Sequence, residues 1–348
     1  MTGADAGGQL EPELMLNPSA RVLWRSAETI QVELGVRGLV VDGLDRASVS
    51  RLVRRGELDD APAPDTLLET ALAELAAAGF LVRRSAAGAA ALKAPRLAGD
   101  LAALRVRFGE RAGAKLARRA EAAVTVQGGT RVAGLVAPLL GAAGVGRVAV
   151  TSTGEARLGH AAPGGVCPND EGERFTLAVG AAIRRAAPEC DTSALPFGVR
   201  PDLVIIADDG PVDPEVRTAL HRRGCPHLVA SAGPDRGVVG PLVIPGLTSC
   251  LRCADRHRAD RDLAWTALAV QLAMPQRPAA PSDVGLATIV ASVAALQALS
   301  LLDGDEPATV EGTLELQLPD WRIRRRSWTP HADCSCGAYA ADIGRPAQ

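Results

Sequence analysis

The chain has 348 residues and a net charge of −2, with 47% hydrophobic, 22% charged and only 3% aromatic residues. This length favours two domains, and the composition is typical of a folded protein with a large core. The near-neutral charge argues against a nucleic-acid partner, and the scarcity of aromatic residues argues against a surface that stacks bases.

The N-terminus and the apolar runs indicate where the protein works. The first residues lack the basic flank and apolar stretch of a secretory signal, and we find no apolar run long enough to span a membrane. We therefore expect a cytoplasmic protein with no membrane partner, in which thiols stay reduced. Seven cysteines in such a chain point to metal binding or catalysis before disulfides.

Residues 1–13 are rich in Gly, Ala and acidic residues and predict a disordered tail. Residues 14–95 alternate short β-type runs with two helical patterns and end in a strand, which predicts a small winged-helix-like α+β domain. The expected elements are strands at Arg21–Trp24, Thr29–Leu34 and Gly38–Asp42, helices at Arg46–Arg55 and Thr66–Ala78, and a strand at Phe80–Arg83. Residues 85–95 have mostly small side chains, which predicts a linker.

Residues 96–340 predict an α/β domain with a Rossmann-like, mostly parallel sheet, followed by a tail at 341–348. The apolar run Asp202–Ala207 is typical of a strand buried on both faces. Strands alternate with helices around it, as in successive βαβ units. The other expected elements are strands at Ala123–Gln127, Arg147–Val150 and His227–Ser231, and helices at Arg131–Ala143, Glu173–Ala187, Pro214–Arg223 and Asp283–Leu302.

Four cysteines occur as two close pairs. Cys250 and Cys253 form a CxxC, and Cys334 and Cys336 form a CxC. A tight turn directs both sulfurs of a pair the same way, and two pairs supply the tetrahedral four-thiolate set that suits structural zinc. A redox CxxC or unligated cysteines are the alternatives.

Three further cysteines have no close partner in the sequence. We expect Cys167, Cys190 and Cys225 to be ordinary buried or surface thiols, with Cys167 and Cys190 kept as candidate catalytic cysteines. His257 and His331 lie near the paired cysteines and are expected to support the metal ligands rather than to replace one.

A glycine turn follows the first strand of the α/β domain. Gly128 and Gly129 precede a helix, and such a turn can present backbone N–H groups to a nucleotide phosphate. The next strand runs into Thr151–Gly154, where an acidic residue would be needed to bind ribose hydroxyls, and Glu155 is the nearest carboxylate. By itself the turn can equally be a simple connection.

The order of these motifs resembles the ThiF/MoeB/HesA family, the bacterial relatives of ubiquitin-activating enzymes. The resemblance covers about Ala122 to Gly337 and rests on the glycine turn with AAGVGRVAV, the strand DLVIIADD, SCLRC and the last cysteine pair. It implies ATP- and magnesium-dependent adenylation of a carboxylate, with Gly128 and Gly129 at the nucleotide. Asp208 then matches the family's magnesium-contacting catalytic aspartate, although it can also be a plain turn residue.

The chain departs from the family at the nucleotide. It has fewer glycines in the turn, no ribose carboxylate, and no counterpart of the family's Asn-Arg-Gln segment in residues 155–175. These departures predict a degenerate ATP site.

A narrower resemblance accounts for the departures. The N-terminal module, CLRCADRHRADRDLAW and HADCSC are similar to actinobacterial ThiF-like proteins that bind leader peptides or form part of cyclodehydratases. The resemblance implies a precursor peptide added as an extra strand, a YcaO-type partner enzyme that performs the ATP-driven chemistry, and homodimerisation.

Two alternative functions stay open. The first is an active adenylyltransferase acting on a peptide or a small carrier protein, and the second is a winged-helix DNA-binding regulator. The regulator is disfavoured because residues 17–95 carry ten basic and ten acidic residues, whereas DNA binding depends on phosphate neutralisation.

The residue pattern also predicts which charged segments lie at the surface and which tryptophan side chains pack in the core. The charged run Arg252–Asp262 is either a solvated helix face or a docking patch for a partner or peptide. Arg324–Arg326 is expected in an exposed edge strand. Trp24 and Trp328 are expected to pack in the core.

Overall fold

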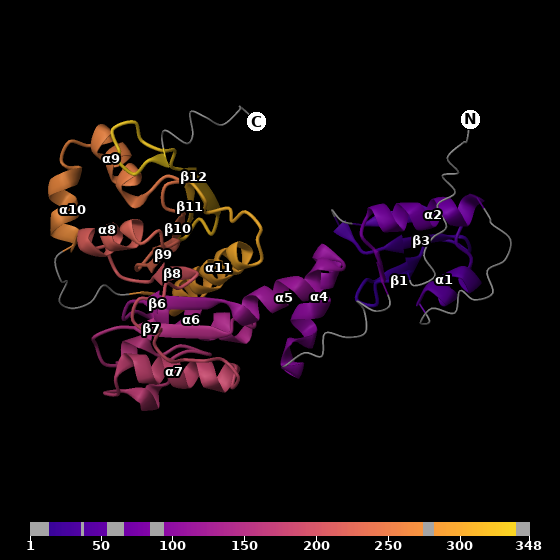
Figure 1. Ribbon diagram of the computed structural model, residues 1–348, viewed down its shortest axis with the longest axis horizontal. Coiled ribbons are helices and arrows are strands. Elements are labelled where there is room, and N and C mark those ends of the chain that lie inside the picture. Colours follow the sequence, from indigo (N-terminus) through magenta and orange to yellow (C-terminus); the bar gives the residue numbers. More distant parts are fainter. Residues whose placement is uncertain (1–13, 36–37, 54–65, 84–93, 274–281, 339–348) are drawn as a thin grey trace. The chain divides into compact units, whose positions relative to one another are not determined.

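The computed structural model describes residues 14–35, 38–53, 66–83, 94–273 and 282–338 (Figure 1). The predicted tails at 1–13 and 341–348, and nearly all of the predicted linker, lie outside these residues. The chain divides into two compact units, Met1–Leu116 and Ala117–Gln348.

The N-terminal unit contains two small antiparallel sheets and several helices. One sheet pairs β1 (Leu14–Leu16) with β5 (Leu81–Arg83), and the other has the order β2-β3-β4. Its remaining elements are β2 (Val22–Trp24), β3 (Thr29–Val32), β4 (Leu39–Asp42), α1 (Arg46–Val53), α2 (Thr66–Ala77), the 3-10 turn η2 (Pro95–Leu97) and α4 (Ala98–Phe108).

The core of this unit lies between the strands and α2. Ile30 and Val32 alternate inward along β3 and pack with Leu75 and Phe80, because successive strand residues point to opposite faces. The element order agrees with the predicted α+β module. The prediction for Trp24 is wrong: its side chain is 38% exposed, and the Arg46 guanidinium lies 5.6 Å from its ring centroid.

The C-terminal unit is built on one seven-stranded sheet of order β12-β11-β10-β9-β8-β6-β7. The four strands from β7 to β9 run parallel, and β10, β11 and β12 are added antiparallel. The strands are β6 (Ala123–Gln127), β7 (Arg147–Thr151), β8 (Leu203–Ile206), β9 (His227–Ala232), β10 (Arg236–Val243), β11 (Gly312–Gln317) and β12 (Ile323–Ser327). All five residues of β12 are exposed, as expected for Arg324–Arg326.

Helices connect the strands of this unit. They are α6 (Arg131–Ala142), α7 (Phe175–Ala186), α8 (Pro214–Arg222), α9 (Leu251–Arg261), α10 (Trp265–Ala273) and α11 (Val284–Leu302), with 3-10 turns η3 (Leu158–His160) and η4 (Pro168–Asp170). The helix α5 (Arg111–Glu121) precedes the first strand, β6, and begins in the N-terminal unit. The ends of most of these helices lie within two residues of the ends predicted from the sequence. Capping residues mark the helix starts, since Thr130 and Asp213 accept hydrogen bonds from backbone N–H groups in the first turns of α6 and α8.

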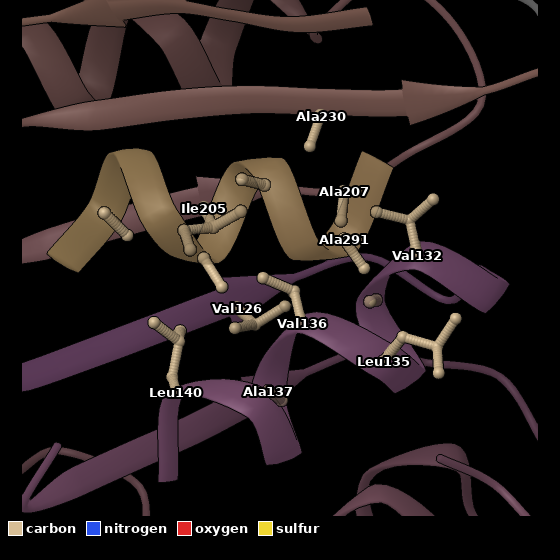
Figure 2. Close-up of a cluster of buried hydrophobic side chains, with 14 of the residues drawn as sticks. Val126, Val132, Leu135, Val136, Ala137, Leu140, Ile205, Ala207, Ala230 and Ala291 are labelled. Carbon is tan, nitrogen blue, oxygen red and sulfur yellow. The ribbon is translucent and has the colours of Figure 1, made fainter. Parts of the chain in front are cut away.

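One face of the sheet packs against α6, α7 and α11. Figure 2 shows side chains of β6, β8, α6 and α11 converging in this cluster, among them Val126, Ile205, Val136 and Ala291. The small residues of α11 let it lie close to α6 and to the strands.

The prediction that no apolar run reaches the length of a membrane span is wrong, because α11 is long and apolar enough to cross one. Its residues Leu286, Val290 and Leu299 are buried in the core cluster of the C-terminal unit. Packing against the sheet therefore accounts for its apolar character.

Candidate functional site

The glycine turn between β6 and α6 lies against the end of β8. A Cβ atom on Gly128 would lie 2.2 Å from the Ala207 carbonyl oxygen, and Gly128 has a φ of +133°. Only glycine fits such an approach. The Thr130 hydroxyl donates to the same carbonyl at 2.8 Å and accepts from Ala133 N. The turn therefore joins β6, α6 and the end of β8 tightly.

Asp208 and Asp209 follow β8 directly and face this turn. Both residues are exposed, although desolvation acts on their carboxylates. Burial raises the pKa of Asp208 despite a backbone hydrogen bond from Gly129, which lowers it. Burial, with the neighbouring charge of Asp208, raises the pKa of Asp209 to about 6. The structure thus brings Asp208 to the glycine turn, as the sequence predicted.

Two features of the glycine turn differ from those expected at a nucleotide site. The Gly129 N–H, a donor that a phosphate would use, acts on the Asp208 carboxylate and lowers its pKa. The end of β7 carries no carboxylate for ribose, and the nearest one, Glu155, lies four residues beyond the strand, where its backbone forms an antiparallel bridge with Arg174.

Two side chains near the turn, Arg131 and His160, are not predicted from the sequence. Arg131 is the first residue of α6, and its NH1 group donates to the Ser282 carbonyl at 2.6 Å. His160 lies close enough that burial, followed by the charges of Arg157 and Arg131, lowers its pKa. In the sequence, the signal for this feature is Arg131, which follows the glycine turn at the start of α6.

The two cysteine pairs meet in one buried cluster. The sulfur–sulfur distances are 3.8 Å for Cys250–Cys253, 3.6 Å for Cys250–Cys334 and 3.6 Å for Cys253–Cys336, and all four sulfurs lie within 4.8 Å of one another. Zinc–sulfur bonds of about 2.3 Å place tetrahedral ligands about 3.8 Å apart. The four thiols therefore fit one zinc ion.

Local structure aims the four sulfurs inward. Cys250 is the N-cap of α9, and Cys253 lies in its first turn, where its N–H bonds to Cys250 O at 3.0 Å. The hydrogen bond from the Cys250 thiol lowers the pKa of Cys253 to about 4, which favours the thiolate that zinc binds. A backbone hydrogen bond from His331 acts in the same direction.

His257, Asp260 and His331 form a second group of potential ligands beside the cysteines. Both ring nitrogens of His331 are occupied, since Nε2 lies 2.9 Å from an Asp260 oxygen and Nδ1 accepts from Asp333 N. His257 Nε2 bonds to the Thr329 carbonyl at 3.0 Å. The two histidines brace the segment before Cys334, and we do not assign a metal to them.

The remaining cysteines are not gathered at a site. Cys190 and Cys225 are buried, and burial raises the pKa of the Cys225 thiol. Cys167 is half-buried at the start of η4.

The seven-stranded sheet and the four-cysteine cluster together define a fold of the ThiF/MoeB type, as the sequence predicted. Solved structures with this fold cover nearly the whole chain. E. coli MccB with AMPCPP and selenomethionyl MccA matches 94% of this chain and 99% of its own, with a TM-score of 0.74 and 14% identity. PaaA matches 89% of this chain and 99% of its own, with a TM-score of 0.66 and 15% identity.

A third match is E. coli MccB with ATP, which covers 93% of this chain and 99% of its own at a TM-score of 0.73 and 14% identity. No protein-family profile matches the sequence, and no curated protein matches it. At these identities the likeness defines the fold.

Proposed function

We propose that this protein is a peptide-binding scaffold with a degenerate nucleotide site. It holds a precursor's leader peptide on its N-terminal unit and presents the peptide to a separate modifying enzyme, a YcaO-type cyclodehydratase. The observation that carries the proposal is the end of β7, which offers no carboxylate for the ribose hydroxyls. A fold can persist as a scaffold after its catalytic groups are lost.

The three-stranded sheet of the N-terminal unit offers a place for a peptide strand. β2 and β4 are its outer strands, and no other strand pairs with them among the described residues. Leu23 and Val40 lie in one row with Gln31 and are 37% and 42% exposed. An added strand would satisfy the edge N–H and C=O groups and cover apolar side chains. The match to MccB in complex with MccA supports a peptide partner.

The nucleotide part is tested by calorimetry with ATP and magnesium. We expect no binding in the micromolar range. Micromolar binding that is lost in Asp208→Asn overturns the scaffold.

The peptide part is tested with sequences selected from a displayed random-peptide library on the full chain. Bound peptides should protect backbone amides of β2 or β4 from hydrogen exchange. Leu23→Arg and Val40→Arg should abolish binding, whereas Leu177→Arg, at a 43% exposed position of α7, should not. Protection confined to the C-terminal unit refutes this part.

An active adenylyltransferase is the second candidate. It is favoured by matches to MccB with AMPCPP and with ATP, and by the paired carboxylates of Asp208 and Asp209 at the glycine turn. Pyrophosphate exchange that depends on a peptide carboxylate would establish it. We also propose that the protein is cytoplasmic and forms a homodimer. Light scattering on the purified chain tests the homodimer.

A further inference from the structure

A cleft of about 560 Å³ opens on the sheet face opposite α6 and α11. Ala230 and Ala232 of β9 are buried in the main core, so the intervening Val229 and Ser231 point to the other face and form part of the cleft floor. The walls come from α8, α9 and the start of α10, and β10 and β11 continue the floor. The cleft is as large as pockets that hold small ligands.

Arginines dominate the charge of this cleft. The lining includes Arg217 from α8, Arg258 and Arg261 from α9, Arg236 from β10 and Arg326 from β12. Its acidic residues are Asp255, Asp262 and Glu315, so five cationic groups face three carboxylates. The cleft is positively charged although the whole chain carries −2.

Two of the three carboxylates are each shared between two arginines. Asp255 binds both Arg217, at 2.7 Å, and Arg258, at 3.1 Å. Glu315 similarly lies 2.9 Å from Arg236 and 3.5 Å from Arg326. One carboxylate cannot satisfy the N–H groups of two guanidinium ions, so donors are left for a further anion.

Arg261 is the cation best placed to take that anion. It has no carboxylate partner among the described residues, and its guanidinium lies 5.8 Å from the Trp328 ring centroid. Two buried N–H donors of the lining, Arg217 Nε and Trp265 Nε1, also have no acceptor there. A bound acceptor would relieve this cost once the side chains turn toward it.

Two indole rings hold the central arginine in place. The Arg258 guanidinium lies 5.1 Å from the Trp265 centroid and 4.8 Å from the Trp328 centroid. Trp328 is itself fixed by a hydrogen bond from Nε1 to Thr313 Oγ1 at 3.1 Å. Burial lowers the pKa of Arg258, since the guanidinium has lost much of its hydration there. A poorly hydrated cation gains more from an incoming anion than an exposed one.

We propose that this cleft binds an acidic segment of the peptide through its Asp or Glu carboxylates. The proposal rests on the proposed function and specifies the chemistry of its substrate. Planar carboxylates match the guanidinium fork, and the Trp and Val side chains of the lining accept the apolar parts of neighbouring residues. The cleft starts at Gly210, directly after Asp208 and Asp209, so the segment would reach the end of β8.

The four-cysteine centre fixes the shape of this cleft. It joins Cys250 and Cys253 at the start of α9 to Cys334 and Cys336, a few residues after Trp328. A zinc ion bound by these four thiols would hold the helix that carries Arg258 and Arg261 beside the indole on which they stack.

The test measures fluorescence anisotropy of fluorescein-labelled hexaglutamate and hexaglutamine with the full chain. We expect hexaglutamate to bind about tenfold more tightly, because one charge-assisted bond is worth about 1.5–3 kcal/mol. Arg261→Gln should remove most of this preference. Arg322→Gln is the control, since Arg322 is 78% exposed and pairs with Asp320 away from the cleft. Arg261 is exposed, so its replacement should leave the unfolding temperature unchanged.

Equal affinity for the two peptides, or an unchanged preference in Arg261→Gln, overturns the proposal. Displacement of hexaglutamate by a lower concentration of tripolyphosphate assigns the cleft to phosphate and overturns it as well. None of these outcomes changes the expected protection of the β2 and β4 backbone amides from hydrogen exchange. Failure of the cleft can therefore be told apart from failure of leader binding, which Leu23→Arg and Val40→Arg report.

Discussion

A buried ion pair joins two distant parts of the C-terminal unit. Arg119 Nε donates to Asp303 Oδ1 at 2.7 Å, and NH2 donates to Oδ2 at 2.6 Å. The two side chains are 5% and 4% exposed. Asp303 is the C-cap of α11, where the helix dipole disfavours an anion, so the bidentate arginine compensates. The pair ties the end of α5 to the end of the long core helix.

Asp303→Ala leaves the Arg119 charge buried and unpaired. Breaking such a pair costs about 3–5 kcal/mol of the free energy of unfolding, against about 0–1 kcal/mol for an exposed pair. Asp191→Ala is the matched control, because Arg147 and Asp191 make a similar contact at 32% and 40% exposure. Urea unfolding followed by tryptophan fluorescence measures both.

The double variant Arg119→Met/Asp303→Leu tests the cause. Replacing both partners by apolar side chains removes the buried charge, so it should regain most of the stability lost in Asp303→Ala. A loss in Asp303→Ala no larger than in Asp191→Ala refutes the reasoning. A double variant as unstable as the single one shows that packing around α11, and not the unpaired charge, sets the cost.

Three further predictions concern the candidate sites. Elemental analysis should find about one zinc per chain, lost in Cys253→Ser and kept in Cys167→Ser. Gly128→Ala should lower the free energy of unfolding by about 3 kcal/mol or more, whereas Gly154→Ala, with open space around it, should change it little. The raised pKa of Asp209, about 6 against 3.8, gives stability that is full below pH 4 and is lost as pH rises through 6. Asp209→Asn should therefore gain in melting temperature over the wild type between pH 4 and 7.

Each of these predictions has a contradicting result. Zinc retained in Cys253→Ser means that the metal lies elsewhere. If the two glycine variants are equally stable, the Ala207 carbonyl shifts away from the added Cβ atom at little cost in free energy. A melting difference between Asp209→Asn and the wild type that does not depend on pH means that the carboxylate titrates outside this range.

The sequence by itself determined most elements of the α/β unit. Asp202–Ala207 reads as a buried strand because all four residues of β8 face core on both sides, and Thr130 and Asp213 mark helix starts through their caps. Two short cysteine spacings predicted the sulfur cluster, since closely spaced ligands need only one turn of chain to converge.

Other features depended on partners that a local pattern does not encode. The strand β10 was missed because Gly237, Gly240 and Pro241 interrupt its apolar run, and it is held by β9 and β11 on either side. Trp24 was predicted to be buried from its size alone, whereas its position on an outer strand leaves it exposed.

The charged cleft was decided by the tertiary structure. The run Arg252–Asp262 suggested either a solvated face or a docking patch, and the i,i+3 pair of Arg258 with Asp255 fits the first alternative. Only the sheet order brings Arg236 and Arg326 opposite that helix. Hydrophobic periodicity records whether a segment is buried, and it does not record which distant segment lies against it.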